Sequence, residues 1–404
     1  MAGLSAAVAL ARQGVRVVLS EAARQAGGRC RSYYDSLLQM TIDNGNHLVL
    51  SGNPAVGRFL DAIGAHGRLV GPSTAVFPFF DVATGRSWAL RPNDGLIPWW
   101  ILTSDRRVPE TSVGDYVAIA RLMRRHTGRR IDEVLRCQGA LWNRLLRPLL
   151  VSVLNTPPEE GSADLAGAVM RETFAKGGRS IHPRVAQPSL AAAFVDPALD
   201  QLRKAGADIR LGRRLANLTL HDGKVASLTF TDGKEDIGPQ DSLILAVPPW
   251  TAQELLPGLV APDAFCAIVN AHFKFAPPRK LPLIVGLVGG TAEWVFAFSD
   301  RLSVTVSAAD RLLDIESTTL GQLLWRDVAA VHGLPGEMPP CRVVKEKRAT
   351  FAATPAQNSR RPPSSTRWSN LFLAGDWTDT GLPATIEGAL RSGERAAALA
   401  AIRR

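Results

Sequence analysis

Near both ends of the chain, the pattern of hydrophobic and polar positions predicts helices alternating with strands. Residues 3–13 are rich in helix-forming residues and stop at a glycine, which predicts a helix. The β-branched run over residues 15–20 then predicts a strand that leads into Glu21. Toward the other end, residues 371–374 predict a strand, and an alanine-rich helix is expected from about residue 384. This order of elements is typical of an α/β fold.

The segment from 198 to 247 combines a helix, a hairpin and a buried strand. A helix is predicted over 198–205, and the hairpin after it turns at Asp222-Gly223. A second Asp-Gly turn at 232–233 leads to the apolar run 242–247. Such a run is typical of a parallel strand that is buried on both faces.

Two other segments have a different character. Residues 75–189 contain four tryptophans and predict helices over 113–125 and 131–154, the second broken at Pro148. Residues 281–298 come nearest to a long apolar run. The Gly289-Gly290 pair within them predicts two strands joined by a turn rather than a membrane span.

The composition is that of a globular protein. The chain has 404 residues, of which 46% are hydrophobic and 21% charged, which excludes wholesale disorder and indicates two or three domains. Four scattered cysteines lack the spacing of a zinc site or a disulfide framework, so we expect no metal and a reducing, cytoplasmic compartment. The sequence shows no signal segment and no apolar run of about 18 residues, which predicts a soluble or peripheral protein.

The net charge of +10 raises the question of a nucleic-acid partner. Basic residues of the central segment have no aromatic residues between them and lie in no nucleic-acid-binding motif; they are Arg121, Arg124, Arg125, Arg129 and Arg130. We therefore expect no nucleic acid among the partners.

Gly3 and Glu21 are spaced like the last glycine and the acidic residue of a dinucleotide-binding unit. In such a unit a helix N-terminus faces the pyrophosphate, and the acid binds the ribose hydroxyls. The first strand and first two glycines of that fingerprint are not in this sequence. An ordinary helix–strand pair is the alternative, and the missing part predicts either a start further upstream or weak cofactor binding.

Three polar turns are further candidates for ligand contact. Gly-Gly-Arg at 27–29 lets the backbone approach a ligand and offers a guanidinium to a phosphate, although it fits a plain surface turn too. Asp-Asn-Gly-Asn-His at 43–47 is a polar turn in which the histidine could be structural. Ala-Gly-Asp-Trp-Thr at 374–378 is followed by a helix whose positive end would face an anion.

These motifs together carry a family resemblance. G-L-S-A-A at 3–7, G-G-R-C-R-S at 27–32 and A-G-D-W-T at 374–378, with the later E-G-A and S-G, resemble the FAD-dependent amine oxidase and carotenoid desaturase superfamily. The segment 207–249, which ends in A-V-P-P-W, is similar to the second nucleotide-domain segment of that superfamily. The resemblance runs over almost the whole chain.

Other motifs narrow the resemblance to the squalene-associated FAD-dependent desaturases, a branch that includes the hydroxysqualene dehydroxylases of hopanoid biosynthesis. They are I-D-N-G-N-H-L-V-L at 42–50, V-L-N-T-P-P at 153–158, N-A-H-F at 270–273 and the stretch 375–393.

The resemblance implies a two-domain α/β fold of the amine oxidase and phytoene desaturase type. A discontinuous Rossmann-type FAD-binding domain would comprise residues 1–74, 190–260 and 340–404. An α+β substrate domain would comprise residues 75–189 and 261–339.

The resemblance also implies which residues bind FAD. Gly3 and Glu21 would serve the pyrophosphate and the adenosine ribose, and the backbone at Leu215 would meet the adenine. The remaining contacts, along the pyrophosphate, the ribityl chain and the flavin N1/O2 edge, would come from Gly27, Gly28, Arg29, Gly375, Asp376, Thr385 and Ile386.

The implied reaction is the reduction of a C30 isoprenoid allylic alcohol to squalene with loss of water. The chemistry needs an apolar tunnel, for which the aromatic residues of 75–189 and 261–339 are candidates, and a proton donor. The candidate donors are Asp43, His47 and His272, each of which could equally be structural.

The stretch L-I-P-W-W-I-L at 96–102 lies between Arg91 and Arg106-Arg107. It suggests contact with an anionic membrane surface, or a wall that closes the substrate cavity from inside. Enzymes of the squalene pathway are further candidate partners.

Three alternatives stay open. A carotenoid desaturase acting on a phytoene-type substrate shares the FAD motifs. An amine oxidase would need an aromatic cage rich in tyrosine, and the chain has three tyrosines. A truncated, flavin-poor and catalytically silent homologue is the third.

Overall fold

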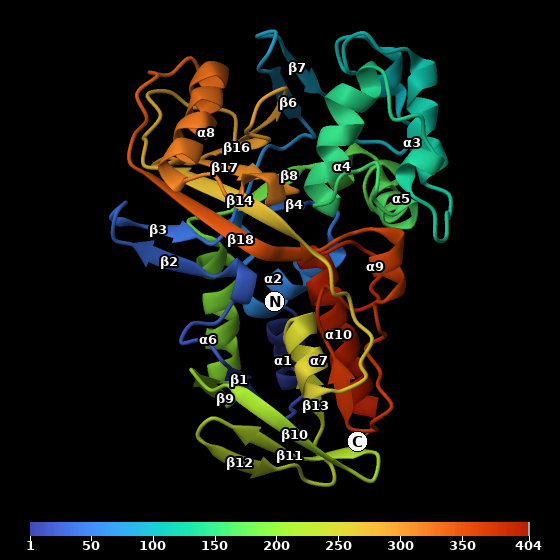
Figure 1. Ribbon diagram of the computed structural model, residues 1–404, viewed down its shortest axis with the longest axis vertical. Helices are drawn as coiled ribbons and strands as arrows, with labels where there is room; N and C mark the ends of the chain where they lie inside the picture. Colours follow the sequence, from blue (N-terminus) through green and yellow to red (C-terminus); the bar gives the residue numbers. More distant parts are fainter. Residues whose placement is uncertain (403–404) are drawn as a thin grey trace.

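The computed structural model describes residues 1–402, which form two halves joined by a long strand (Figure 1). The α-helices are α1 (Ala2–Ala11), α2 (Pro54–Ile63), α3 (Val117–Leu122), α4 (Arg147–Leu154), α5 (Ala163–Glu172), α6 (Asp196–Lys204), α7 (Pro249–Leu255), α8 (Ser317–His332), α9 (Pro355–Ser359) and α10 (Ile386–Ile402). The strands in the first half of the sequence are β1 (Val18–Glu21), β2 (Ser32–Asp35), β3 (Met40–Asp43), β4 (Leu48–Leu50), β5 (Leu69–Val70), β6 (Phe77–Asp81), β7 (Ser87–Leu90) and β8 (Pro183–Ala186). The later strands are β9 (Asp208–Leu211), β10 (Leu215–His221), β11 (Lys224–Phe230), β12 (Gly233–Asp236), β13 (Leu243–Leu245), β14 (Phe265–Phe273), β15 (Ile284–Val288), β16 (Trp294–Ala297), β17 (Leu302–Val306), β18 (Cys341–Phe351) and β19 (Leu371–Leu373).

The lower half of Figure 1 contains two parallel strand pairs and the helices that cover them. β1 pairs with β9 in the register Val18↔Asp208, and β13 pairs with β19 in the register Leu243↔Leu371. Within the described residues the two pairs are separate sheets, and α1 and α10 pack together beside the second pair. Parallel strands linked through helices confirm the expected α/β fold class.

The upper half is built on a seven-stranded sheet in the order β18-β14-β17-β16-β15-β6-β7. Its two faces differ, because side chains along a strand point alternately to opposite sides. Val269, Ala271 and Phe273 of β14 join the apolar cluster under α8. The intervening Asn270 and His272 face the other way, toward the nucleotide half, and contact Thr305 and Ser303 of β17.

The second face of the sheet changes from polar to aromatic in one continuous row. Paired positions run from Asn270 through Thr305 to Trp294. They continue through Gly286 to Phe79 and Trp88, whose rings stack at 5.6 Å. A β-carbon on Gly286 would stand 2.6 Å from the Phe79 ring, so the glycine makes room for this aromatic packing.

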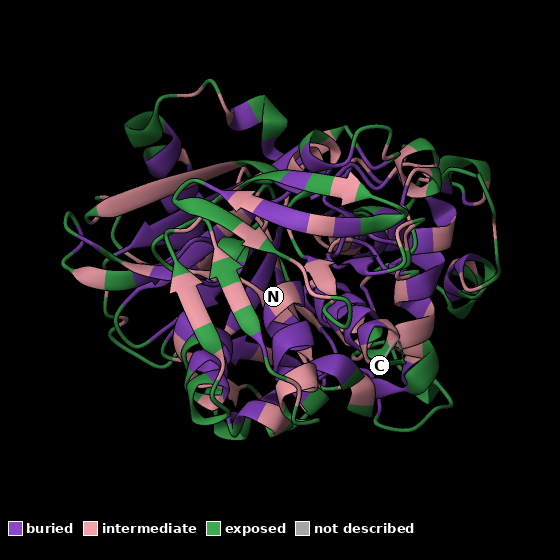
Figure 2. Cartoon of the chain, turned by 90° about the horizontal axis from the view of Figure 1, so that it is seen from below, coloured by how far each residue is buried: buried purple, intermediate pink, exposed green. Residues whose placement is uncertain are grey.

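Buried residues gather in the middle of the molecule and exposed ones at its rim (Figure 2). The buried Asn155 ties the α-helical part to the sheet: its amide nitrogen donates to Cys266 O and Thr350 Oγ1, and its oxygen accepts from the Ala308 N–H. The motif V-L-N-T-P-P therefore connects the end of α4 to the sheet through hydrogen bonds of Asn155.

Most predicted elements are confirmed, but the helices predicted over 113–125 and 131–154 differ from the structure in type and length. The Asp222-Gly223 hairpin and the two strands around Gly289 are present, whereas β12 and the short length of β13 were not foreseen. The helix predicted over 131–154 is wrong in its first half: a capped 3₁₀ turn covers Ile131–Glu133, and helix resumes at Ala140. Pro148 does not break it: helical residues run without interruption to Leu154, and a π-helical turn, Trp142–Leu146, directly precedes α4.

The helix predicted over 113–125 is a 3₁₀ turn, Val113–Tyr116, followed by the six-residue α3. The division into two domains at the residues given above stays a prediction.

Two helix glycines are expected to respond in opposite ways to alanine. A β-carbon on Gly393 of α10 would stand 2.2 Å from the Ala2 carbonyl oxygen of α1, whereas one on Gly57 of α2 meets nothing within 4 Å. Gly393→Ala should lower the free energy of unfolding by about 1–3 kcal/mol. Gly57→Ala should raise it by up to about 1 kcal/mol. Urea denaturation of both variants checks this, and equal effects would contradict the close approach of α1 to α10.

Candidate functional site

Arg29 brings together segments from both ends of the chain. It lies in a 3₁₀ turn, Gly28–Cys30, that begins after Gly27 with a φ of 109°, a value that favours glycine. Its Nη2 donates to Asp376 Oδ1 at 2.7 Å, and its Nη1 donates to the Ala349 carbonyl in β18. Met1, at the start of α1, lies within electrostatic range of Arg29, Asp376 and Glu21. The structure therefore brings together the turn 27–29, the turn at Asp376 and the start of α1.

The guanidinium of Arg29 keeps part of its surface open although the chain surrounds it. It lies deep enough for desolvation to act on it, yet 43% of its side-chain surface is open, while Asp376 is 8% exposed. Although burial opposes it, attraction to Asp376 raises the pKa of Arg29, so the cation is permanent. A deep, accessible cation next to the first residues of α1 suits the anionic pyrophosphate of a dinucleotide.

Gly3 and Gly375 allow two close approaches between neighbouring segments. A β-carbon on Gly3 would stand 3.1 Å from Ala246, just after β13, and one on Gly375 would stand 2.3 Å from the Trp377 indole nitrogen. The Gly375 N–H donates to Ser392 Oγ of α10. Both glycines are therefore needed for packing around the site, whatever the ligand.

Arg361 holds the turn that presents Asp376, and sequence reasoning missed it. Its Nη2 donates to the carbonyls of Asp376 and Thr378 and to Thr380 Oγ1. Burial lowers its pKa to about 10, still well above neutral pH, so the turn is fixed by a charged donor. It lies in the stretch 354–367, whose proline, serine and arginine residues are typical of a polar loop and do not indicate burial.

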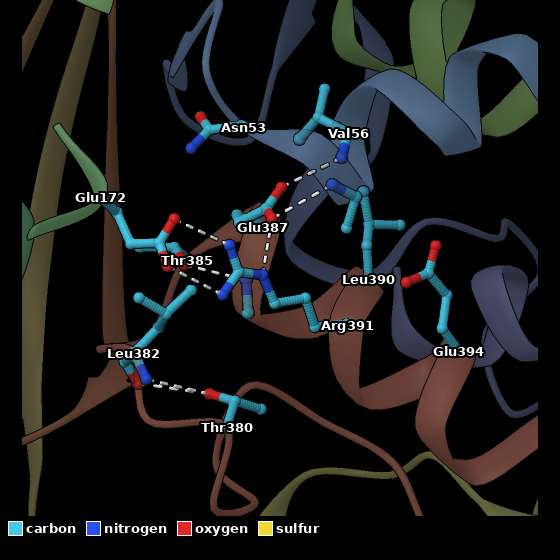
Figure 3. A network of polar contacts seen from close by, with 12 residues as sticks. Asn53, Val56, Glu172, Thr380, Leu382, Thr385, Glu387, Leu390, Arg391 and Glu394 are labelled. Carbon is cyan, nitrogen blue, oxygen red and sulfur yellow. Dashed lines mark hydrogen bonds and ion pairs between the residues drawn. The ribbon is translucent and has the colours of Figure 1, made fainter. Parts of the chain in front are cut away.

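The start of α10 is anchored by a buried carboxylate (Figure 3). Glu387 accepts hydrogen bonds from the backbone N–H groups of Ala55 and Val56 at the N-terminus of α2, at 3.1 and 3.0 Å. Arg391 donates to Glu387 at 2.7 Å and reaches Glu172 at the end of α5. The network fixes the first turn of α10 against both halves.

Thr385 caps α10, since its Oγ1 accepts the Gly388 N–H at 3.0 Å. Thr385 is half-buried, and the Ile386 that follows it is buried as the first residue of the helix. The predicted pair therefore stands at the positive end of a 17-residue helix.

The two residues expected at the adenosine end also lie together. Glu21 ends β1, and its carbonyl accepts the N–H of Arg213, two residues before Leu215 begins β10. The side chain of Glu21 accepts the Ala23 N–H at 2.9 Å.

The loop 43–47 docks on the polar face of the sheet. The Asn46 N–H and Thr305 Oγ1 both donate to Asn270 Oδ1, and a β-carbon on Gly45 would meet the Asn270 amide at 2.8 Å. Two motifs of the predicted branch, I-D-N-G-N-H and N-A-H-F, are thus in direct contact. This contact fixes the position of His47.

Of the three candidate proton donors, His47 is the one that lies beside Arg29. Burial, and the nearby Arg29, lower the pKa of His47 to about 4. Burial, and then Arg301, lower the pKa of the fully buried His272 to about 4 as well; its Nδ1 lies 2.9 Å from Ser303 Oγ. Asp43 is buried and accepts from Ser32 Oγ and the Leu190 N–H. Asp43 and His272 therefore stabilise the sheet and its neighbours.

Glu346 of β18 is a carboxyl beside the site that sequence reasoning missed. Its Oε2 accepts from Asn44 Nδ2 at 3.2 Å, and its charge acts on Arg29. In the sequence it stands within the charged run K-E-K-R, which gives no sign of an inward-facing side chain.

Comparison with known proteins agrees with this arrangement. Residues 1–401 match the family described as flavin containing amine oxidoreductase. The chain belongs to this family. It is therefore an FAD-dependent oxidoreductase, as its motifs predicted.

Within the family, the chain is similar to curated hydroxysqualene dehydroxylases. It is 48% identical to that of Rhodopseudomonas palustris over 99% of this chain and 96% of the relative. It is 50% identical to that of Sinorhizobium fredii with the same coverage of each chain. The predicted branch is confirmed.

Solved structures confirm the fold. An oxidoreductase from Methanosarcina mazei superposes with a TM-score of 0.72 over 97% of this chain and 96% of that one, at 14% identity. Cyclohexylamine oxidase from Brevibacterium oxydans gives 0.68 over 99% and 97%, at 15% identity. At these identities the likeness concerns the fold of the flavoenzyme.

Among residues 1–402, no three histidine, cysteine, aspartate or glutamate side chains cluster as metal ligands would.

The buried His272 is expected to make the flavoenzyme sensitive to acid. Its folded pKa of about 4 lies below its ordinary value of 6.5, so between these values the unfolded chain binds the extra proton. The free energy of unfolding should therefore fall as pH drops from 6.5 to 4, by up to about 3 kcal/mol for this group. The measurement is urea unfolding across that range for the wild type and His272→Gln, whose slope against pH should be shallower.

His221→Gln is the matched control, since that side chain is 75% exposed. It should leave the slope unchanged. Equal slopes for His272→Gln and the wild type would contradict the buried, neutral imidazole.

Proposed function

We propose that the enzyme uses reduced FAD to convert hydroxysqualene to squalene with loss of water. The observation that carries the proposal is identity of 47–50% to three curated hydroxysqualene dehydroxylases, over 99% of this chain in each case. The contact between the loop 43–47 and Asn270 supports it, because it places two branch motifs beside the cofactor residues.

FAD supplies a hydride from its reduced flavin. In this proposal Glu21 and the backbone at Leu215 hold the adenosine, and the α1 start at Gly3 faces the pyrophosphate. The turns 27–29 and 375–376 hold the pyrophosphate and ribityl chain, supported by the open, charged Arg29 paired with Asp376. Thr385 and Ile386 present the positive end of α10 to the N1/O2 edge, where it would stabilise the negative charge of the reduced flavin.

A hydrocarbon substrate needs an apolar wall that excludes water from the reacting carbon. The aromatic part of the sheet row, Trp294, Phe79 and Trp88, begins one strand away from Thr305 and the docked loop 43–47. We propose that it binds the hydrocarbon arms of the substrate, with the hydroxyl held toward the polar side.

His47 lies beside Arg29 and is neutral at physiological pH, because its pKa is about 4. We propose that it is a hydrogen-bonding contact to the cofactor or substrate and does not supply the proton.

Product analysis tests the proposal. The full chain with FAD, reduced by dithionite under anaerobic conditions, should convert hydroxysqualene to squalene and oxidise its flavin once per product. Phytoene with the oxidised enzyme is the control for the desaturase alternative, since phytoene desaturase of Arabidopsis thaliana is 24% identical over 49% of this chain. Turnover of phytoene alone would overturn the proposal.

We also propose that the enzyme docks on an anionic membrane, where a squalene-sized substrate and the other enzymes of its pathway would be found. Exposed apolar side chains gather on a 3₁₀ turn, Trp99–Leu102, and on its neighbours: Leu96, Ile97, Trp99, Leu102, Val113 and Val117. Arg106 lies over the Trp99 ring at 4.6 Å. Outward apolar residues beside arginines match a bilayer interface with anionic lipids. No helix within the described residues is long and apolar enough to cross a membrane.

The double variant Ile97→Ser, Leu102→Ser should weaken binding to phosphatidylglycerol vesicles at least about tenfold, because it removes apolar area from the interface. Cosedimentation at low and high salt measures this. The control, Leu37→Ser with Val260→Ser, removes two other exposed apolar side chains elsewhere on the surface and should bind like the wild type. Equal loss in both would show a general effect of surface hydrophobicity and overturn the proposed patch.

A further inference from the structure

Charged side chains of alternating sign lead from the first turn of α10 to the end of α5 (Figure 3). Glu387 accepts from Arg391 Nε at 2.7 Å, and Arg391 Nη2 donates to Glu172 at 3.1 Å. Glu172 also accepts from the Nζ of Lys176, four residues further along the chain, at 2.6 Å. Two carboxylates and two cations therefore balance one another beside the helix start that was proposed above to face the flavin.

Every hydrogen-bond partner of the Glu387 carboxyl group is a donor. Oε1 accepts from the Ala55 N–H and from Arg391, and Oε2 accepts from the Val56 N–H. The side chain is 4% exposed, so bulk water contributes little to this set. A carboxyl group in such surroundings is ionised, because a proton on either oxygen would face these donors. Glu387 thus places a full negative charge in the first turn of α10.

This negative charge opposes the positive end of the helix that carries it. Glu387 is the second residue of α10, and a carboxylate there cancels part of the field of the helix dipole. The N-terminus of α2 compensates part of the charge through two N–H groups, at a helix start where the N-cap residue Asn53 makes no side-chain cap. Arg391, one helical turn after Glu387, supplies a full positive charge.

Arg391 is a permanent cation that is held at both ends of its guanidinium. Its side chain is partly buried, and burial lowers its pKa, but hydrogen bonds to Glu172 and Glu387 outweigh that effect and raise the pKa of Arg391. The spacing of four residues puts Arg391 and Glu387 on one face of α10. Glu172, on a different helix, keeps the guanidinium from turning away toward solvent.

We propose that Arg391 is a positioning residue that raises the reduction potential of the bound flavin by compensating the charge of Glu387. The inference rests on the placement, proposed above, of the α10 start at the flavin N1/O2 edge. Reduction adds two electrons and one proton, so the reduced flavin carries one more negative charge than the oxidised form. With Arg391 in place, the pair with Glu387 is neutral as a whole, and the helix end stabilises that added charge.

The compensation serves the proposed reaction at the step that precedes it. Each dehydroxylation consumes one reduced flavin, so the cofactor must be reduced again before the next turnover. A carboxylate without its cation would repel the charge of the reduced flavin and make that reduction harder. Arg391 therefore allows the chain to use Glu387 as the anchor between α10 and α2 without this electrostatic cost.

Arg391→Gln removes the positive charge and keeps a polar side chain. In the FAD-loaded full chain, the equilibrium between oxidised and reduced flavin should shift about tenfold toward the oxidised form, which for a two-electron couple is a midpoint potential about 30 mV lower. Arg391→Lys keeps the charge and should recover most of that shift. The measurement is an anaerobic spectroscopic titration against a reference dye of known potential.

A second ion pair between the same two helices provides the matched control. Arg58 of α2 donates to Glu394 of α10 at 3.0 Å, and the Arg58 side chain is 56% exposed. Water and salt screen a charge in this position. Arg58→Gln should therefore leave the midpoint potential unchanged, although it too removes a cation that links α2 to α10.

The sign of the shift separates an electrostatic role from a structural one. Glu387→Gln removes the negative charge and should raise the midpoint potential, and the double variant with Arg391→Gln should return close to the wild type. A distorted helix start would instead shift the potential in the same direction in both single variants, or release FAD. If Glu387→Gln does not fold, Glu172→Gln takes its place, because it removes a negative charge from the same network without touching the contacts to α2. It too should raise the potential.

The possible outcomes are distinct. If the FAD-loaded wild type does not convert hydroxysqualene, the proposed dehydroxylation fails, and the titrations still decide the role of Arg391. If Arg391→Gln keeps the wild-type potential or loses FAD, the inference is wrong. It is equally wrong if loss of the cation and loss of the carboxylate shift the potential in the same direction.

Discussion

The ion pair between Arg29 and Asp376 is the constraint on which the candidate site depends. A guanidinium this far from bulk water is costly unless a carboxylate and hydrogen-bond acceptors compensate it. Two acceptors from different parts of the chain supply that compensation. Asp376 Oδ1 accepts from Arg29 Nη2 at 2.7 Å, and the Ala349 carbonyl accepts from Arg29 Nη1. Moving any of the three would leave a buried charge unpaired, so the turn 27–29, the turn at 375–376 and β18 must keep one mutual arrangement. The open side of the guanidinium is then left for an anion.

Further polar contacts extend this constraint outward. Arg361 fixes the carbonyls behind Asp376, and Glu387 fixes α10 to the first N–H groups of α2. Both are buried and charged, and both act on main-chain groups that a helix or turn would otherwise leave unsatisfied. The cofactor residues thus stand on an array of fixed dipoles, which is what stabilisation of a reduced flavin requires.

Local sequence signals identified much of this. The Asp222-Gly223 hairpin, α1, β19 and the start of α10 follow from turn chemistry and periodicity, and the cofactor motifs follow from the family resemblance. Long-range packing decided the rest. Nothing local marks Arg361 as buried, Glu346 as facing inward, or residues 134–139 as non-helical, because each depends on partners far away in the chain. Asp43 and His272 are both buried: Asp43 accepts from the Leu190 N–H and His272 Nδ1 lies beside Ser303 Oγ, while His272 Nε2 has no hydrogen-bond partner among the described residues.

The sheet face explains how one fold can present a single polar group within a long hydrocarbon to a flavin. Neighbouring strands lie about 4.8 Å apart, so Thr305 and Trp294, which are paired, mark a polar-to-aromatic boundary one strand wide. An alcohol in the middle of an isoprenoid chain has the same abrupt boundary. Binding it elsewhere on this face would either bury the hydroxyl against Phe79 and Trp88 or place hydrocarbon against Asn270, and both cost free energy. In the proposed function, this boundary would set the register of the substrate along the sheet. Because the loop 43–47 and Glu346 lie on its polar side, that register would also decide which carbon is brought to the cofactor.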